Sequence, residues 1–310
     1  MENPPFAELH SGPFSKKSTA EEVTQHCDLS GKTFFVTGVN SGFGLESTRV
    51  LAMRGATVFG AARTIEKARI ALATIPGETV PVECELSDPE SITRCAAGIT
   101  EAGECLDALL CNAGVMMLPH RETVLGVEKQ MFVNTLGHYL LIDLLKPALQ
   151  RSIDPRVVIT SSLAEAQAAK LDLDDLGAQK KYDSFRNYKL SKLANNLLMV
   201  ELSRRYQEIG ISVNCVEPGA AMTGLERHMT GFRDALLLFI GKFFMSTIEE
   251  CTATQVYLAT SDDYRGVTGH FFGGCQPRRA SRQARDETLA HKFVSRCDEI
   301  LRPYLSVTSS

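Results

Sequence analysis

The sequence lacks the excess of basic residues that nucleic-acid-binding proteins carry. It has 33 Lys and Arg against 37 Asp and Glu, which gives a net charge of −4. Because binding to a phosphate backbone depends on Lys and Arg, we expect no nucleic-acid partner. Apolar residues make up 44% and charged residues 23% of the chain, as in ordinary globular proteins, so collagen-like, coiled-coil and disordered architectures are excluded.

Cysteines at metal-site or redox-motif spacing are also lacking. The nine cysteines are odd in number and irregularly spaced, and no Cys-x-x-Cys occurs. Several lie inside apolar runs, such as Cys111 and Cys215, where a small buried side chain is the simpler interpretation. The first thirty residues show no basic start followed by an apolar stretch, which argues against a signal peptide. We therefore expect no metal site and a reducing, cytoplasmic location.

Long apolar runs are absent as well. No run approaches the length of about 18 residues that a membrane-spanning helix needs, so no transmembrane span is predicted. The nearest approach is the apolar run 235–240, which is followed by Phe243, Phe244 and Met245. This stretch is more typical of a core or lid helix than of a patch in peripheral contact with a membrane, although both interpretations stay open.

Short apolar segments alternate with longer segments of helical periodicity along the chain. Strands are expected at 33–37, 56–62, 79–84, 107–111, 156–160, 211–216 and 269–272. Helices are expected at 42–54, 65–73, 89–102, 127–150 and 187–209. Such alternation predicts right-handed βαβ crossovers and a doubly wound, Rossmann-type α/β fold with a parallel sheet. Because no linker interrupts it, we expect a lead-in over 1–28 and a single domain over 29–310.

A glycine-rich turn joins the first expected strand to the first expected helix. Glycines at this place let the backbone approach a pyrophosphate, and the N–H groups and dipole of the helix face its charge. The alternative, a tight turn that needs glycine for positive φ, is less favoured in a βαβ series. We expect the cofactor to contact Gly38, Asn40, Ser41, Gly42, Phe43 and Gly44.

The end of the second expected strand bears on the choice between the two nicotinamide dinucleotides. NAD sites carry Asp or Glu there for the ribose 2′-hydroxyl, whereas an Arg accommodates a 2′-phosphate. This chain has Arg63 and no acidic residue before Glu66. We therefore expect NADP(H), with Arg63 as a ligand of the 2′-phosphate.

Six motifs occur in the order typical of the short-chain dehydrogenase/reductase family. They are Thr-Gly-x-x-x-Gly-x-Gly at 37–44, Asn-Ala-Gly at 112–114, Asn134, Ser161-Ser162, Tyr-x-x-x-Lys at 188–192 and Pro-Gly at 218–219. Each motif alone is weak, but six in order at the expected element ends are no coincidence. The chain resembles this family over 29–301. The resemblance implies further cofactor contacts from Glu85, Leu86, Asn112, Ala113, Gly114, Tyr188, Lys192, Pro218, Gly219 and Thr223.

Three residues depart from the pattern of the family. Glu85 stands where the family usually has an aspartate that bonds the adenine amine. Cys111 replaces the first asparagine of the Asn-Asn-Ala-Gly motif. Glu217 precedes Pro-Gly where His or Asn is usual, which predicts an acid near the nicotinamide.

The resemblance and the spacing together suggest how a carbonyl group would be reduced. Tyr188 and Lys192 are four residues apart on one helix face, so their side chains are neighbours. The charge of Lys192, with that of the oxidised nicotinamide, is expected to lower the pKa of Tyr188 from about 10 and make it a general acid/base. Ser162 is expected to donate a hydrogen bond to the substrate oxygen, with Ser161 as the alternative. Asn134 is expected to hold a water that relays the proton.

Within the family, the chain looks most like the branch of retinol dehydrogenases, the WW-domain-containing oxidoreductase and their chloroplast-envelope relatives. The shared features include the lead-in 18–23, the spacing of Ser162 and Tyr188, and the segment 269–272. The resemblance implies an apolar aldehyde, ketone or alcohol as substrate, such as a retinoid, lipid or terpenoid, and allows a homodimer. The apolar segment 220–246 is expected to cover this substrate as a lid.

Two other functions share part of this pattern. An NADPH-binding redox sensor or scaffold would need the dinucleotide site but no proton donor, so the intact Ser162, Tyr188 and Lys192 favour an enzyme. A double-bond reductase would also use Tyr188 and Lys192, and only a comparison of enone with carbonyl substrates would separate it.

Overall fold

The computed structural model describes residues 9, 11–219 and 246–305. The proposed lid, except for Ser246, and the proposed cofactor ligand Thr223 lie outside the described residues. None of the described helices is both long enough and apolar enough to cross a membrane.

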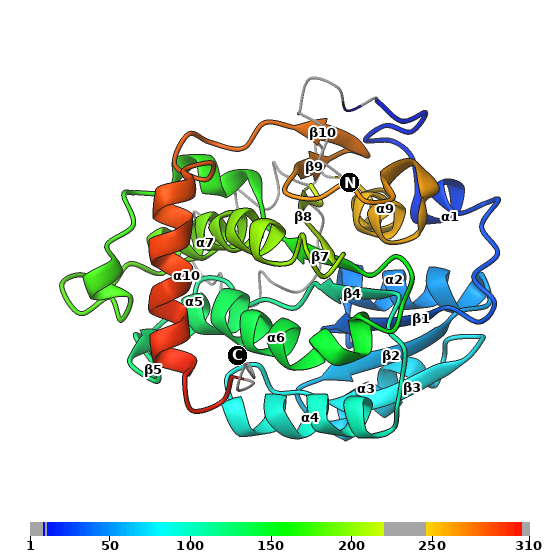
Figure 1. Cartoon of the computed structure of the whole chain (residues 1–310), viewed down its shortest axis with the longest axis horizontal. Coiled ribbons are helices and arrows are strands. Elements are labelled where there is room, and N and C mark those ends of the chain that lie inside the picture. The colour runs from blue at the N-terminus through cyan, green and yellow to red at the C-terminus, as the bar shows by residue number, and fades with distance from the viewer. Residues whose placement is uncertain (1–8, 10, 220–245, 306–310) are drawn as a thin grey trace.

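An eight-stranded sheet forms the centre of the molecule (Figure 1). In spatial order its strands are β10 (Gln276–Arg278), β9 (Phe271–Gly273), β8 (Ser212–Glu217), β7 (Arg156–Thr160), β4 (Ala108–Cys111), β1 (Thr33–Thr37), β2 (Thr57–Ala62) and β3 (Thr79–Glu83). All neighbouring strands pair parallel except β9 and β10. The strands that follow β1 are added first on one side of it (β2, β3) and then on the other (β4, β7, β8). This order confirms the doubly wound Rossmann-type fold in a single domain.

Helices cover both faces of this sheet. One layer holds α1 (Ala20–Val23), α2 (Gly42–Met53) and α9 (Ile248–Thr260), and the other holds α4 (Pro89–Glu101), α6 (Gly137–Leu149), α7 (Ser184–Arg205) and α10 (Glu287–Leu301). α3 (Ile65–Leu72) packs against β2 and β3. Figure 1 shows α10 lying beside α7, against which it packs.

Successive side chains of the central strands point into different helix layers. On β1, Phe35 belongs to the hydrophobic cluster of α4, α6, α7 and α10, whereas Phe34 and Val36 belong to the cluster of α1, α2 and α9. Leu109 and Leu110 divide in the same way on β4. Because side chains alternate along a strand, a strand covered on both faces must be apolar throughout, as these are.

The expected helix 127–150 is wrong in its first part. The structure has a hairpin of β5 (Thr123–Val124) and β6 (Val127–Glu128), the short α5 (Lys129–Met131), a π-helical turn η2 (Phe132–Leu136) and only then α6. The Glu128 carboxylate accepts hydrogen bonds from the N–H groups of Gln130 and Met131, so helical structure begins after it. The π-helical turn η2 contains one residue more than an ordinary α-helical turn, and it separates α5 from α6.

The C-terminal third contains more structure than the sequence patterns predict. The expected last strand, 269–272, is β9, and a further strand, β10, returns antiparallel beside it. Two helices, α9 and α10, were not predicted. The N-terminal lead-in also packs onto the domain, because Ala20 and Val23 are buried and the Phe14 ring meets that of Tyr257 edge-on at 5.0 Å.

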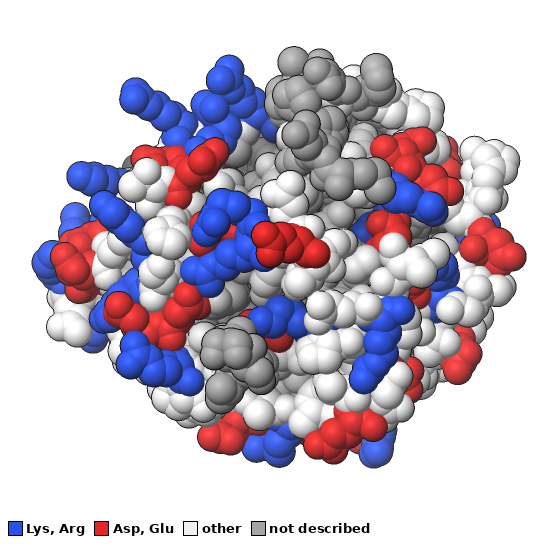
Figure 2. Space-filling model, viewed as in Figure 1, with Lys and Arg blue, Asp and Glu red and all other residues white. Residues whose placement is uncertain are grey.

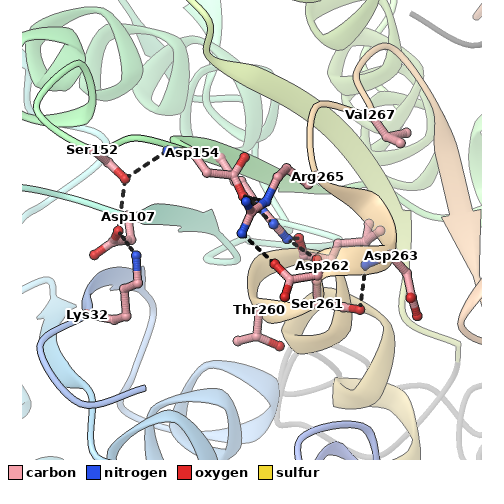
Figure 3. A network of polar contacts seen from close by, with 12 residues as sticks. Lys32, Asp107, Ser152, Asp154, Thr260, Ser261, Asp262, Asp263, Arg265 and Val267 are labelled. Carbon is pink, nitrogen blue, oxygen red and sulfur yellow. Dashed lines mark hydrogen bonds and ion pairs between the residues drawn. The ribbon is translucent and has the colours of Figure 1, made fainter. Parts of the chain in front are cut away.

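The amino ends of the parallel strands are joined by ion pairs and hydrogen bonds (Figure 3). Lys32 and Ser152 both bond Asp107, at 3.0 and 2.9 Å. The buried Arg156 donates to Asp154 and to the carbonyls of Leu258 and Ser261 at the end of α9. The polar groups of this edge are satisfied by one another, which gives it a structural role.

Candidate active site

The glycine-rich turn lies where β1 ends and α2 begins. Gly38 and Gly42 have φ of +76° and +59°, a region that favours glycine. A Cβ on Gly44 would lie 2.4 Å from the carbonyl oxygen of Gly38, so a side chain is excluded there. Ser41, the residue before α2, makes no side-chain cap hydrogen bond, which leaves the first N–H groups of the helix uncapped by it. These are the properties of an anion cradle at a helix N-terminus.

The three residues expected to contact the adenosine end of the cofactor, Arg63, Glu85 and Leu86, lie in different environments. Arg63 follows β2 directly, is exposed, and makes no hydrogen bond or ion pair with another described residue. The carboxylate of Glu85 accepts hydrogen bonds from the N–H and the hydroxyl of Ser87, both at 2.9 Å, so it stabilises its own turn. Leu86 is buried beneath Gly137, whose Cβ would lie 2.5 Å from the Leu86 carbonyl oxygen.

The Asn-Ala-Gly segment after β4 is fixed to the end of β1. The Thr37 hydroxyl accepts hydrogen bonds from the N–H groups of Asn112 and Ala113, each at 2.9 Å. The Asn112 amide donates to the Thr37 carbonyl, also at 2.9 Å. A Cβ on Gly114 would lie 3.2 Å from Asn134 Oδ1 and 3.9 Å from Lys192 Nζ. This segment therefore connects the glycine turn with the expected catalytic residues.

The side chain of Asn134 makes three hydrogen bonds within the protein. Its Oδ1 accepts the N–H of Val115 at 2.8 Å, and its Nδ2 donates to the Val115 carbonyl and to Ser191 Oγ at 3.0 and 2.9 Å. Because both amide hydrogens are donated within the protein, a water held by Asn134 would have to donate to one of its oxygens, such as the backbone carbonyl. His138 Nδ1 lies 3.1 Å from that carbonyl oxygen.

Ser162, Tyr188 and Lys192 come together where β7 ends. Lys192 Nζ donates to the carbonyl of Thr160 at 2.9 Å and lies 5.6 Å from the centre of the Tyr188 ring. Ser161 is buried and its hydroxyl donates to the Lys192 carbonyl at 2.8 Å, so it fixes α7. The hydroxyl of Ser162 is the one that hydrogen-bonds Tyr188. Of the two serines, Ser162 is therefore the one whose hydroxyl lies beside Tyr188.

The expected fall in the Tyr188 pKa is not produced by the protein alone. Burial raises the pKa of Tyr188, and the hydrogen bond from Ser162 only partly offsets this effect. Burial also lowers the pKa of Lys192, to about 8, because its ammonium group is removed from water. In the protein without cofactor, desolvation thus dominates the pKa of both groups, and the lowering expected from Lys192 together with the oxidised nicotinamide stays a prediction.

Glu217, expected as an acid near the nicotinamide, is engaged at the end of β8. Its carboxylate lies 3.2 Å from Arg278 Nη1 and accepts the N–H of Gly219 at 3.0 Å. Burial raises the pKa of Glu217, which Arg278 opposes. Gly219, after Pro218, has φ of +93°. Glu217 thus shapes the turn that carries the expected cofactor ligands.

Sequence reasoning overlooked three residues of the site. His138 lies between Thr37 and Asn134, and its only signal was its place four residues after Asn134. Leu163 and Phe185 are large apolar side chains that are 52% and 43% exposed. They flank Ser162 and Tyr188 along the chain, and the Phe185 ring stacks on that of Tyr188 at 6.4 Å.

Comparison with known proteins agrees with this arrangement. The sequence profile of a family described as short chain dehydrogenase matches residues 32–233. The chain belongs to the short-chain dehydrogenase/reductase family. Human retinol dehydrogenase 13 is 38% identical over 276 residues, which cover 86% of this chain and 83% of the relative. Human retinol dehydrogenase 11 is 35% identical, covering 93% and 92%. The chloroplastic short-chain dehydrogenase TIC 32 B of Brassica napus is 36% identical, covering 90% and 92%.

Solved structures of other proteins have the same fold as this short-chain dehydrogenase/reductase. An uncharacterised protein from Mycobacterium paratuberculosis superposes with a TM-score of 0.73 and 29% identity over 99% of this chain and 100% of that one. RhlG of Pseudomonas aeruginosa, solved as an active-site complex with NADP, has a TM-score of 0.63 and 26% identity over 79% and 95%. The family uses NAD(P)(H), and the start of α2, whose first N–H groups are not capped by Ser41, fits its pyrophosphate.

The described residues contain no candidate metal site. Among residues 9, 11–219 and 246–305, no three His, Cys, Asp or Glu side chains are placed to hold a metal ion. On the face drawn in Figure 2, basic and acidic side chains are interspersed over much of the surface.

Proposed function

We propose that this oxidoreductase uses NADP(H) to interconvert an apolar aldehyde or ketone and the corresponding alcohol. The observation that carries the proposal is the convergence of Ser162, Tyr188 and Lys192 beside the Gly114 segment that joins them to the glycine turn. A protein that only bound the dinucleotide would have no use for a hydroxyl pair and a buried ammonium group at this place.

Each side chain of this group has a separate task. When bound, the nicotinamide supplies or accepts the hydride. Ser162 donates a hydrogen bond to the carbonyl oxygen, and Tyr188 gives that oxygen its proton during reduction. Lys192 has a pKa of about 8, so it is mostly charged at neutral pH and stabilises the tyrosinate that remains.

The decisive experiment compares the wild type with Tyr188→Phe on a panel of retinal, long-chain aldehydes, ketones and enones. Following NADPH absorbance, we expect wild-type turnover of apolar carbonyls and a fall of about 10²–10⁴-fold in the variant. NADPH binding, measured by fluorescence, should be unchanged. Tight NADPH binding without turnover in either protein would contradict an enzymatic role, and exclusive reduction of enone double bonds would assign the other reductase chemistry.

The preference for NADP(H) rests on Arg63. Its exposed guanidinium lies beyond β2 and is not engaged by another described residue, so it is available to a 2′-phosphate. We expect Arg63→Leu to raise the KM for NADPH by about tenfold, the loss of one charge-assisted contact, with little change for NADH. Lys67→Leu, at an exposed position on α3, is the matched control. Equal losses for both cofactors in Arg63→Leu would exclude a specific 2′-phosphate contact.

The proposal of an apolar substrate rests on Leu163 and Phe185. Leu163 directly follows Ser162, and the Phe185 ring stacks on that of Tyr188, so each exposed apolar side chain is next to a reacting group. Their positions next to Ser162 and Tyr188 place apolar surface at the approach to the reacting groups. The names of the two human relatives, both retinol dehydrogenases, support the same class of substrate.

A further inference from the structure

His138 is a buried polar residue to which neither the family resemblance nor the proposed chemistry gives a role. It lies in the first turn of α6 and is 1% exposed. Its ring spans two parts of the active site: Nε2 is 3.0 Å from the Thr37 hydroxyl, and Nδ1 is 3.1 Å from the carbonyl oxygen of Asn134. Thr37 holds the cofactor-binding ends of β1 and β4, and Asn134 belongs to the catalytic group.

The hydrogen bonds of Thr37 determine which nitrogen of His138 carries the proton. The Thr37 hydroxyl oxygen already accepts the N–H groups of Asn112 and Ala113. Its own hydrogen therefore points to His138 Nε2 at 3.0 Å rather than to the carbonyl of Leu110 at 3.4 Å. Because Nε2 accepts, Nδ1 carries the ring hydrogen and donates it to Asn134. Burial lowers the pKa of His138 to about 4, so the ring stays neutral and keeps this arrangement near neutral pH.

The π-helical turn explains why a side chain is needed at this place. In η2, the N–H of Gly137 bonds the carbonyl of Phe132, five residues back, instead of the carbonyl four residues back. Such an inserted residue puts the carbonyls of the turn out of the ordinary helical register, and turns of this type are frequent at functional sites. The imidazole fixes the direction of the Asn134 carbonyl within this irregular turn.

Beyond Asn134 the contacts continue to the catalytic helix. The Asn134 amide donates to Ser191 Oγ at 2.9 Å, and that hydroxyl donates to the Tyr188 carbonyl at 2.8 Å. Thr135 adds a second connection, since its hydroxyl lies 3.1 Å from the Ser191 carbonyl and 2.7 Å from Asn195 Oδ1. A continuous chain of short polar contacts thus runs from β1 through η2 to α7.

We propose that His138 is a positioning residue that couples the cofactor-binding ends of β1 and β4 to the Asn134 turn and thereby to Tyr188 and Lys192. A rigid, singly protonated ring that donates at one end and accepts at the other transmits a displacement of Thr37 to the Asn134 carbonyl. The proposal builds on the assigned dinucleotide site and needs no particular substrate.

The test measures amide hydrogen exchange in the full chain with and without NADPH. We expect NADPH to slow exchange in the wild type at the glycine turn, in η2 and in the first half of α7. His138→Asn keeps a donor where Nδ1 lies but loses the contact with Thr37. His138→Gln keeps the contact with Thr37 but loses the one with Asn134, and His138→Phe fills the volume without either hydrogen bond. In all three variants, protection should persist at the glycine turn and disappear from η2 and α7.

Turnover gives a second readout in the same variants. We expect kcat of His138→Gln and His138→Phe to fall by about 10–100-fold, as for misplaced reacting groups, with KM for NADPH near the wild-type value. His138→Asn should lose activity to a similar extent, because it breaks the connection at Thr37. If His138→Phe does not fold, His138→Asn and His138→Gln, which each keep one of the two hydrogen bonds, decide the matter.

Two results would overturn the proposal. One is NADPH-dependent protection of η2 and α7 in His138→Gln equal to that in the wild type. The other is absence of such protection in the wild type itself, although NADPH binds. Because exchange requires only the cofactor, a wild type that turns over no carbonyl compound would contradict the proposed function and leave this test intact.

Discussion

Side chains that are adjacent in sequence take opposite roles at the end of β7. Ser161 is buried and donates to a backbone carbonyl of α7, whereas Ser162 points to Tyr188. The difference arises because successive residues of an extended segment face opposite sides. The sequence alone therefore could favour one serine but could not exclude the other.

This division predicts different consequences for two similar substitutions. Ser162→Ala should reduce kcat by about 10²–10³-fold, since it removes the hydrogen bond to the developing oxyanion. Ser161→Ala should leave kcat largely unchanged and lower the free energy of unfolding by about 1 kcal/mol, the net value of one hydrogen bond. Steady-state kinetics and urea unfolding of both variants check this, and a larger kinetic loss in Ser161→Ala would reverse the assignment.

Among the helices, α10 depends on a single buried carboxylate for part of its attachment. Glu201 on α7 is 2% exposed and bonds Arg204 and Arg205 from its own helix and His291 from α10, at 2.8, 2.8 and 3.1 Å. Arg205 also reaches Asp298 of α10 at 2.9 Å. Burial alone would raise the pKa of Glu201, but the hydrogen bonds from its three partners outweigh burial and hold it at about 2.

We expect Glu201→Gln to lower the free energy of unfolding by about 2 kcal/mol, as for lost hydrogen bonds between charged groups. Because the native pKa lies below the unfolded value, the stabilisation is present above about pH 4.3 and is lost as the pH falls toward 2. The difference between wild type and variant in urea should therefore shrink on acidification. Glu299→Gln, which breaks an exposed pair with Arg296, is the control and should cost well under 1 kcal/mol. A constant difference from neutral to acid pH would contradict this account.

At the scale of the whole molecule, the two edges of the sheet divide stability from function. The glycine turn, the Asn-Ala-Gly segment and the residues proposed as catalytic lie at the carboxyl edge. The amino edge collects the network of Figure 3, in which polar groups bond one another. Open parallel sheets bind ligands at the carboxyl ends of their strands, which explains the choice of edge.

A substitution of Arg156 tests whether the amino edge serves stability and not cofactor binding. Its side chain is 6% exposed and donates to two carbonyls at the end of α9 and to Asp154. We expect Arg156→Met to lower the free energy of unfolding by about 2 kcal/mol, because two carbonyls at the end of α9 and the half-buried Asp154 carboxylate lose hydrogen bonds from a charged group, while the Kd of the folded protein for NADPH stays the same. Arg265→Met, whose side chain is 58% exposed, should cost less than about 1 kcal/mol. A weakened NADPH affinity in Arg156→Met would show that the edges are coupled.

The alternation of apolar runs with helical periodicity was sufficient to predict the sheet, since each βαβ unit is encoded locally. It predicted the bounds of six strands, β1, β2, β3, β4, β7 and β8, within one or two residues. The motifs also predicted that Tyr188 and Lys192 are neighbours, because residues four apart on a helix have adjacent side chains. The alternation failed for the segment 127–136, where a capping carboxylate and a π-turn interrupt an apolar pattern that reads as one helix.

The sequence by itself determined the fold, the family and the types of residue at the carboxyl edge, because element type and motif spacing depend on near neighbours. Only the tertiary structure decided which serine faces Tyr188, that burial raises the pKa of Tyr188, and that His138 joins Thr37 to Asn134. These properties depend on residues far apart in the chain, whose contacts and loss of water exist only after the sheet and both helix layers have packed.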